Sequence, residues 1–141
     1  PNLTEACLLT DTPYREDPDE AFVQALLQKL SHLAPRVVLT GVSFDDDHLG
    51  AMSYDRTTGR YFAYYNEKVH AGFHGTGDIF TATVLGAMMQ GRTLEQAVTL
   101  AVDFTLECIR CTCADPAASW YGVEFEKALP WLARQNNAGA E

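Results

Sequence analysis

A glycine-rich turn followed by an acid is the part of this sequence whose residue types and spacing could carry chemistry. It reads His74-Gly75-Thr76-Gly77-Asp78-Ile79-Phe80. Glycines let backbone N–H groups approach a ligand closely, and the start of a helix carries partial positive charge. Consecutive amides there could surround a transferring phosphoryl group as an anion hole, with Asp78 beside them as a base. Asp78 also has a simpler interpretation, which is that it complements the helix dipole and caps the helix.

Other residues with reactive or ligating side chains favour structural interpretations. Asp45-Asp46-Asp47 is expected to be a solvated loop, because adjacent carboxylates repel one another unless an ion is present. Three of the four cysteines lie within six residues, without the further ligands of a tetrahedral zinc site, so we expect reduced thiols. The cysteines are Cys7, Cys108, Cys111 and Cys113. Surface, backbone-bonding or packing roles are favoured for Glu5 taken alone, His70, His74, Asp103, Glu107, Trp120 and Trp131.

Hydrophobic periodicity and turn residues predict the elements that must position these side chains. The expected helices span 3–10, 19–33, 78–90, 93–112 and 123–133, and the expected strands span 36–42, 50–54 and 60–65. Strand 36–42 lacks alternation and is expected to be covered on both faces. Helix 78–90 is expected to be buried and to end at Gly91, and a capping box of Thr93 and Gln96 is expected to start the next helix. Residues 55–59 are expected to join the last two strands as an antiparallel hairpin. In the last helix Phe125, Leu129 and Leu132 are expected to face inward, with a frayed tail from Asn136.

Composition and charge limit the classes of protein to which the chain can belong. Its 141 residues are 47% hydrophobic and 21% charged, which favours one packed α/β domain over residues 1–141. A formal net charge of −9 argues against broad attraction to nucleic acid or anionic lipid. No apolar run approaches the ~20 residues needed to cross a bilayer, so we expect a soluble, cytoplasmic protein.

Several segments, taken in order, resemble the C-terminal half of the ribokinase superfamily. They are Pro1-Asn2-Leu3-Thr4-Glu5, Val38-Leu39-Thr40-Gly41 and Gly75-Thr76-Gly77-Asp78. Within that group, residues 49–59 and 73–80 are similar to the pyridoxal, pyridoxine and pyridoxamine kinases. The resemblance extends from Asn2 to about Leu132 and implies a ribokinase-like three-layer α/β/α sandwich, of which this chain is the nucleotide-binding C-terminal portion with a β-hairpin at the sheet edge. Because no strand precedes the Pro1-Asn2 turn, we expect a chain from which the N-terminal half is absent.

The resemblance also implies a role for each matching residue of the glycine turn. Asp78 would match the catalytic base that takes the proton from the substrate hydroxymethyl group as it attacks the γ-phosphorus of ATP. Gly75, Thr76 and Gly77 would match the anion hole over that phosphate.

Further matching positions are implied on the nucleotide side. Asn2 and Glu5 match an Asn-x-x-Glu motif whose Glu orders Mg²⁺ near the ATP phosphates, largely through water. Thr40, with Gly41 beside it, lies where the family has a side chain that reaches the phosphates. The loop of Glu67, Lys68, Val69 and His70, Val69 especially, lies near where the family borders the adenine of ATP.

The resemblance implies ATP-dependent phosphorylation of the 5′-hydroxymethyl group of a B6 vitamer (pyridoxal, pyridoxine or pyridoxamine), with ATP and Mg²⁺ as cofactors and a homodimer as the expected assembly. The isolated 141-residue chain is expected to have negligible activity, because the half of the family fold with most contacts to the vitamin ring is missing. Two alternatives stay open. One is a kinase for another small alcohol, such as hydroxymethylpyrimidine or a sugar, and the other is a non-catalytic nucleotide-binding or dimerisation module.

Overall fold

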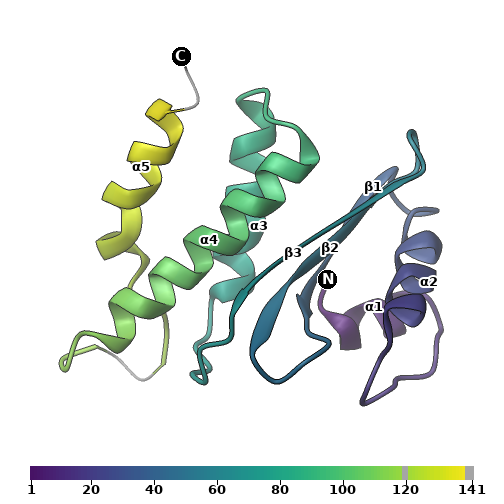
Figure 1. Cartoon of the computed structure of the whole chain (residues 1–141), viewed down its shortest axis with the longest axis horizontal. Coiled ribbons are helices and arrows are strands. Elements are labelled where there is room, and N and C mark those ends of the chain that lie inside the picture. Colours follow the sequence, from purple (N-terminus) through teal and green to yellow (C-terminus); the bar gives the residue numbers. More distant parts are fainter. Residues whose placement is uncertain (119–120, 139–141) are drawn as a thin grey trace. The chain divides into compact units, whose positions relative to one another are not determined.

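The computed structural model describes residues 1–118 and 121–138 (Figure 1). The chain divides into two compact units, Pro1–Lys68 and Val69–Glu141. The first unit contains a sheet with two helices, and the second is helical. The fold class is therefore α/β, as predicted. Within the described part of the chain, no helix is both long enough and apolar enough to span a bilayer.

The first unit is built on a three-stranded antiparallel sheet with the order β1-β2-β3. Its elements are α1 (Leu3–Leu9), α2 (Glu20–Leu30), β1 (Arg36–Val42), β2 (His48–Asp55) and β3 (Arg60–Glu67). The predicted hairpin is confirmed: β2 and β3 pair continuously from Asp55 opposite Arg60 to His48 opposite Glu67. Both strands extend two residues beyond the predicted segments at this far end, so Glu67 is the last residue of β3 rather than part of a loop.

The core of this unit lies between one face of the sheet and the helices α1 and α2. Val37 and Leu39 of β1 are buried in it, together with Leu26 and Leu27 of α2. The alternate residue Val38 is only partly buried. The side chains of β1 therefore alternate between the core and a less buried face, whereas its apolar run predicted equal cover on both faces.

A close approach of backbones explains one glycine in the hairpin. A Cβ atom added to Gly50 in β2 would lie 1.9 Å from the carbonyl oxygen of Tyr64 in β3. No side chain fits at that separation, so the pairing of these two strands requires glycine at position 50.

The second unit contains α3 (Thr76–Met89), α4 (Leu94–Cys113), the 3₁₀ turn η1 (Phe125–Ala128) and α5 (Leu129–Ala138). Gly91 follows α3 with φ of +87°, the conformation that ends helices, as predicted. The capping box that was predicted to start α4 is confirmed, because the side chains of Thr93 and Gln96 each accept from the backbone N–H of the other residue.

Side-chain burial in the second unit differs from the sequence-based predictions. α3 is not buried all round: Leu85 is 60% exposed and Met89 is 80% exposed. In the last helical region Phe125 and Leu129 are partly exposed, although they were predicted to face inward. Leu132 and Trp131 pack against the core, which confirms the prediction for these two residues. These errors share one cause: periodicity identifies an apolar stripe but not whether another element covers it.

The C-terminal region is helical further than predicted. α5 continues to Ala138, so residues 136–138 are not a frayed tail, and residues 139–141 lie outside the described part. Trp120, for which we predicted a packing role, also lies outside the described residues. The other tryptophan, Trp131, stacks on Phe104 of α4 with ring centroids 6.2 Å apart, which confirms it as a packing residue.

Candidate phosphate-binding and catalytic site

The glycine turn forms the first turn of α3 rather than a loop ahead of it. Gly75 is the N-cap, with φ of +87° and ψ of −5°, and the helix begins at Thr76. This left-handed conformation favours glycine. Gly75 provides no side-chain cap, and the first N–H groups of any helix lack partners within the helix. The amides of Thr76, Gly77 and Asp78 are therefore positioned to bind an anion, which the helix dipole also favours.

Asp78 lies in this first turn with an exposed side chain. Its carboxylate makes no hydrogen bond or ion pair with the described residues, so it does not act as a side-chain cap. The capping interpretation is therefore wrong, while the dipole interpretation and the base interpretation both stay compatible with the geometry. A carboxylate that is not engaged by its own protein is able to accept a proton from a ligand.

Asn2 and Glu5 form a reciprocal capping box at the start of α1. The Asn2 side-chain oxygen accepts from the Glu5 N–H, and Glu5 Oε2 accepts from the Asn2 N–H, both at 2.9 Å. The Asn-x-x-Glu spacing thus has a local structural purpose. The second carboxylate oxygen of Glu5 has no partner among the described residues and lies on an exposed side chain, which fits a water-mediated contact with a cation.

The start of α1 is joined directly to the end of β1. The Pro1 carbonyl accepts from the Thr40 backbone N–H at 2.9 Å and from the Thr40 hydroxyl at 3.4 Å. The register then shifts at Gly41, which has φ of +68° and forms a bulge. These contacts bring the Asn2–Glu5 motif and the Thr40–Gly41 pair together, although Thr40 follows Glu5 by 35 positions in the sequence.

The segment predicted to border adenine crosses from the first unit to the second. Glu67 ends β3 opposite His48, and the Lys68 N–H donates to the Asp47 carbonyl at 2.7 Å. In the second unit the Val69 carbonyl accepts from the Ala71 N–H at 2.8 Å in a tight turn, and the neighbouring His70 is exposed. Antiparallel pairing places the end of β3 at the same end of the sheet as the Gly41 bulge.

The candidate residues therefore form two groups, one in each unit. Asn2, Glu5, Thr40, Gly41, Glu67 and Lys68 belong to the first unit, and Val69, His70, Gly75, Thr76, Gly77 and Asp78 belong to the second. The sequence reasoning missed two backbone anchors. One is the Pro1 carbonyl described above. The other is an isolated parallel bridge between His74 and Gly122. The segment 121–123 is too short to show the hydrophobic periodicity of a strand, so the sequence did not predict it.

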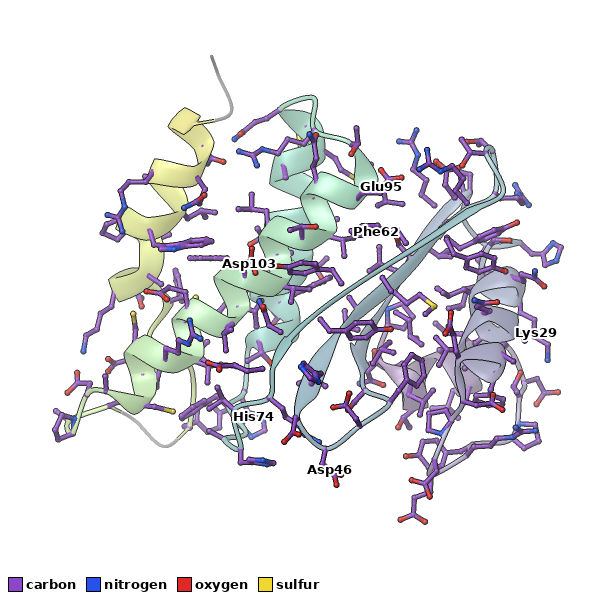
Figure 2. The ribbon with its side chains drawn as sticks, in the orientation of Figure 1. Lys29, Asp46, Phe62, His74, Glu95 and Asp103 are labelled. Carbon is purple, nitrogen blue, oxygen red and sulfur yellow. The ribbon has the colours of Figure 1, made fainter. Side chains whose placement is uncertain are left out.

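The acidic loop between β1 and β2 has a structural explanation. Asp45 accepts hydrogen bonds from the backbone N–H groups of Asp47 and His48 and contacts the His48 ring. The Asp47 amide, followed by the His48 ring, holds the pKa of the Asp45 carboxyl below its usual range. Asp46 is exposed on this loop (Figure 2), which confirms the prediction of a solvated segment. Among residues 1–118 and 121–138, no cluster of three or more His, Cys, Asp or Glu side chains could hold a metal, and the four cysteines are free.

Comparison with known proteins identifies the class to which this fold belongs. In a crystal structure of a candidate phosphomethylpyrimidine kinase from Bacteroides thetaiotaomicron, 33% identical, 94% of this chain and 46% of that chain superpose with a TM-score of 0.87. An orthorhombic crystal form of a kinase with the same description and organism, which contains pyridoxal, is 32% identical. It superposes on 94% of this chain and 48% of that chain with a TM-score of 0.85. For pyridoxal kinase from Lactobacillus plantarum, 25% identical, they are 98% and 49%, with a TM-score of 0.83. The fold is that of the ribokinase-like kinases, as predicted.

The sequence profile of the phosphomethylpyrimidine kinases matches residues 1–119. The chain therefore belongs to the phosphomethylpyrimidine kinase family. It spans about half the length of the similar structures. A search of curated protein sequences gave no match. Pyridoxal kinase from Leishmania donovani in complex with ADP and pyridoxamine, 22% identical over 94% of this chain and 46% of that chain, shares the fold with a TM-score of 0.80.

Proposed function

We propose that this chain binds the phosphates of ATP and supplies the catalytic base of a kinase that phosphorylates the 5′-hydroxymethyl group of pyridoxal, pyridoxine or pyridoxamine. The observation that carries the proposal is the start of α3, where a left-handed glycine precedes uncapped amides and Asp78 is exposed without a partner among the described residues. The pyridoxal in one similar structure and the name of another as a pyridoxal kinase support the choice of substrate.

In this proposal the residues of α3 divide the reaction between them. Asp78 accepts the proton of the substrate hydroxyl as its oxygen forms a bond to the γ-phosphorus of ATP, while the bond from that phosphorus to the oxygen retained by ADP breaks. The amides of Thr76, Gly77 and Asp78 donate to the oxygens of the transferring group and stabilise its spreading charge. Because these donors are already held in place by the helix, they need little reorganisation during the reaction.

The first unit would hold the rest of the nucleotide. The free oxygen of Glu5 would bind Mg²⁺ through water, and a bound Mg²⁺ would supply further neutralisation of phosphate charge. Thr40 and Gly41 would lie beside the phosphates, and the segment 67–70 would border the adenine. We also propose that residues 1–141 act as the nucleotide-binding half of one kinase domain, in a cytoplasmic homodimer.

A kinase for hydroxymethylpyrimidine is the second candidate. It is favoured by the family match over residues 1–119 and by the name of the structure that is 33% identical. The base and anion-hole chemistry is the same for both acceptors, since each presents a hydroxymethyl group on an aromatic ring. The two candidates differ in the residues that would surround the ring.

The test combines nucleotide binding by this chain with turnover by the complete encoded protein. Calorimetry with Mg²⁺ and the ATP analogue AMP-PNP measures binding, and a coupled ADP-release assay compares pyridoxal, pyridoxine, pyridoxamine, hydroxymethylpyrimidine and ribose. Asp78→Ala is expected to lower kcat by about 10²- to 10⁴-fold with nucleotide affinity within threefold of wild type. Asp46→Ala, at an exposed loop carboxylate, is the control. Unchanged kcat in Asp78→Ala would refute the base role, and binding without turnover of any acceptor would favour a non-catalytic module.

A further inference from the structure

The residue before the glycine turn is held from both sides of its backbone by a segment far away in the sequence. The His74 N–H donates to the Tyr121 carbonyl at 3.1 Å, and the Val123 N–H donates to the His74 carbonyl at 3.4 Å. These bonds form the isolated parallel bridge between His74 and Gly122. His74 is labelled in Figure 2, ahead of the start of α3. The bridge therefore restrains the residue from which the left-handed turn at Gly75 departs.

The side chains of the bridged segments are also in contact. The His74 imidazole and the Tyr121 phenol lie with centroids 5.0 Å apart and planes tilted by 35°. This separation is within the range of favourable aromatic pairs. Tyr121 is 61% exposed, so its ring is not a core residue and its burial explains little of its position. The Tyr121 ring contacts the side chain of His74, the residue that the bridge restrains.

The other end of the segment is anchored to α4. The Glu124 N–H donates to the Thr112 hydroxyl at 2.9 Å, and that hydroxyl, which is buried, donates to the Cys108 carbonyl at 2.7 Å. Lys127 forms ion pairs with both Asp115 and Glu124, on either side of the segment. Residues 121–123 thus extend from a fixed point at the end of α4 to the backbone of His74.

We propose that residues 121–123 form a clasp that positions the phosphate-binding turn at Gly75–Asp78, with Tyr121 as its positioning residue. This inference rests on the proposed function for the role of the turn. The clasp holds the backbone of His74, and the next residue begins the turn whose amides would meet the phosphates. Because anion-hole donors act through their fixed geometry, loosening the residue next to them is expected to weaken their contact with phosphate.

The clasp is tested on the full 141-residue chain by backbone NMR. Amide hydrogen exchange of His74 is compared with that of Ala101, a fully buried residue of α4 that reports on global stability. In Tyr121→Ala the His74 amide is expected to exchange roughly 2- to 10-fold faster, which is the factor expected from the loss of an aromatic contact, with Ala101 unchanged. Tyr121→Phe keeps the ring contact with His74, and its His74 amide is expected to exchange more slowly than that of Tyr121→Ala. Tyr14→Ala removes a ring of similar exposure, 57%, in the first unit and serves as the matched control.

The positioning role is read from the ligand response of the same samples. Adding Mg²⁺ and AMP-PNP is expected to shift the amide signals of Gly75, Thr76 and Gly77 in the wild-type chain, and to shift them less in Tyr121→Ala than in Tyr121→Phe or Tyr14→Ala. An equal response in wild type and Tyr121→Ala, or faster exchange of His74 and Ala101 by the same factor, would overturn the clasp. No response in the wild-type chain would count against the proposed function, while the exchange measurement still decides whether the ring holds the turn.

Discussion

Replacing Gly77 with alanine is expected to move stability and nucleotide binding in opposite directions. Gly77 is the second residue of α3, and a Cβ atom added there meets nothing within 4 Å. Its φ is not in the left-handed region, so alanine fits the helical backbone without strain. Glycine in a helix costs roughly 0.5–1 kcal/mol relative to alanine, and Gly77→Ala should recover up to that amount. For a chain of this size the expected rise in Tm is about 2–5 °C.

Binding should change in the other direction, because the added methyl group lies beside amides that are proposed to contact phosphate. A hydrogen bond to a charged group contributes about 1.5–3 kcal/mol. Loss or lengthening of one such bond is therefore expected to weaken binding of Mg²⁺ and AMP-PNP by about tenfold, or ~1.4 kcal/mol. Thermal unfolding followed by circular dichroism and calorimetric titration measure the two effects on the same sample.

Gly86→Ala is the matched control for this experiment. Gly86 lies in the same helix, and an added Cβ likewise meets nothing within 4 Å, but it is nine residues further from the N-terminus. It should raise Tm and leave the Kd unchanged. If Gly77→Ala stabilises the chain and binds AMP-PNP as tightly as wild type does, the amides at the start of α3 do not contact the phosphates, and the reasoning from the glycine turn fails.

Three further predictions follow from individual contacts. Gly50→Ala should destabilise the first unit by about 3 kcal/mol or more, seen as a lower urea midpoint, because its Cβ would lie 1.9 Å from the Tyr64 carbonyl oxygen. Glu5→Gln should leave helix α1 intact, since glutamine also completes a capping box with Asn2, but should raise the Mg²⁺ concentration needed for half-maximal AMP-PNP binding. Burial raises the pKa of the Cys108 thiol to about 12 from 9.0, so the free energy of unfolding should fall as the pH rises through that interval, and Cys108→Ala should remove this component of the decline.

Each of these predictions has its own control or contrary outcome. Gly72→Ala, where an added Cβ meets nothing within 4 Å, should be nearly neutral, and a loss equal to that of Gly50→Ala would count against the steric explanation. Identical Mg²⁺ dependence in wild type and Glu5→Gln would remove Glu5 from the cation site. For the thiol the sign is set by protonation: above pH 9 the unfolded state loses a proton that the folded state keeps, so rising pH favours unfolding. Stability that stays level from pH 9 to 11 would contradict this.

The caps and turns of this protein were predictable because each one depends on residues a few positions apart. The boxes formed by Asn2 with Glu5 and by Thr93 with Gln96 need only a spacing of three. The hairpin and the helix end at Gly91 depend on turn residues in the same local way. The glycine turn itself was found from its sequence, although it proved to be the first turn of α3 rather than a loop ahead of the helix.

Exposure and long-range contacts were decided only by the tertiary structure. Periodicity marked α3 as apolar, but which of its residues are covered depends on the neighbouring elements, and Leu85 and Met89 are exposed. Two anchors of the candidate site, from Pro1 to Thr40 and from Tyr121 to His74, join residues separated by more than 35 positions. A backbone carbonyl accepts a hydrogen bond whatever side chain its residue carries. Such contacts therefore do not restrict the amino acid at either position, and they form only once the chain has folded.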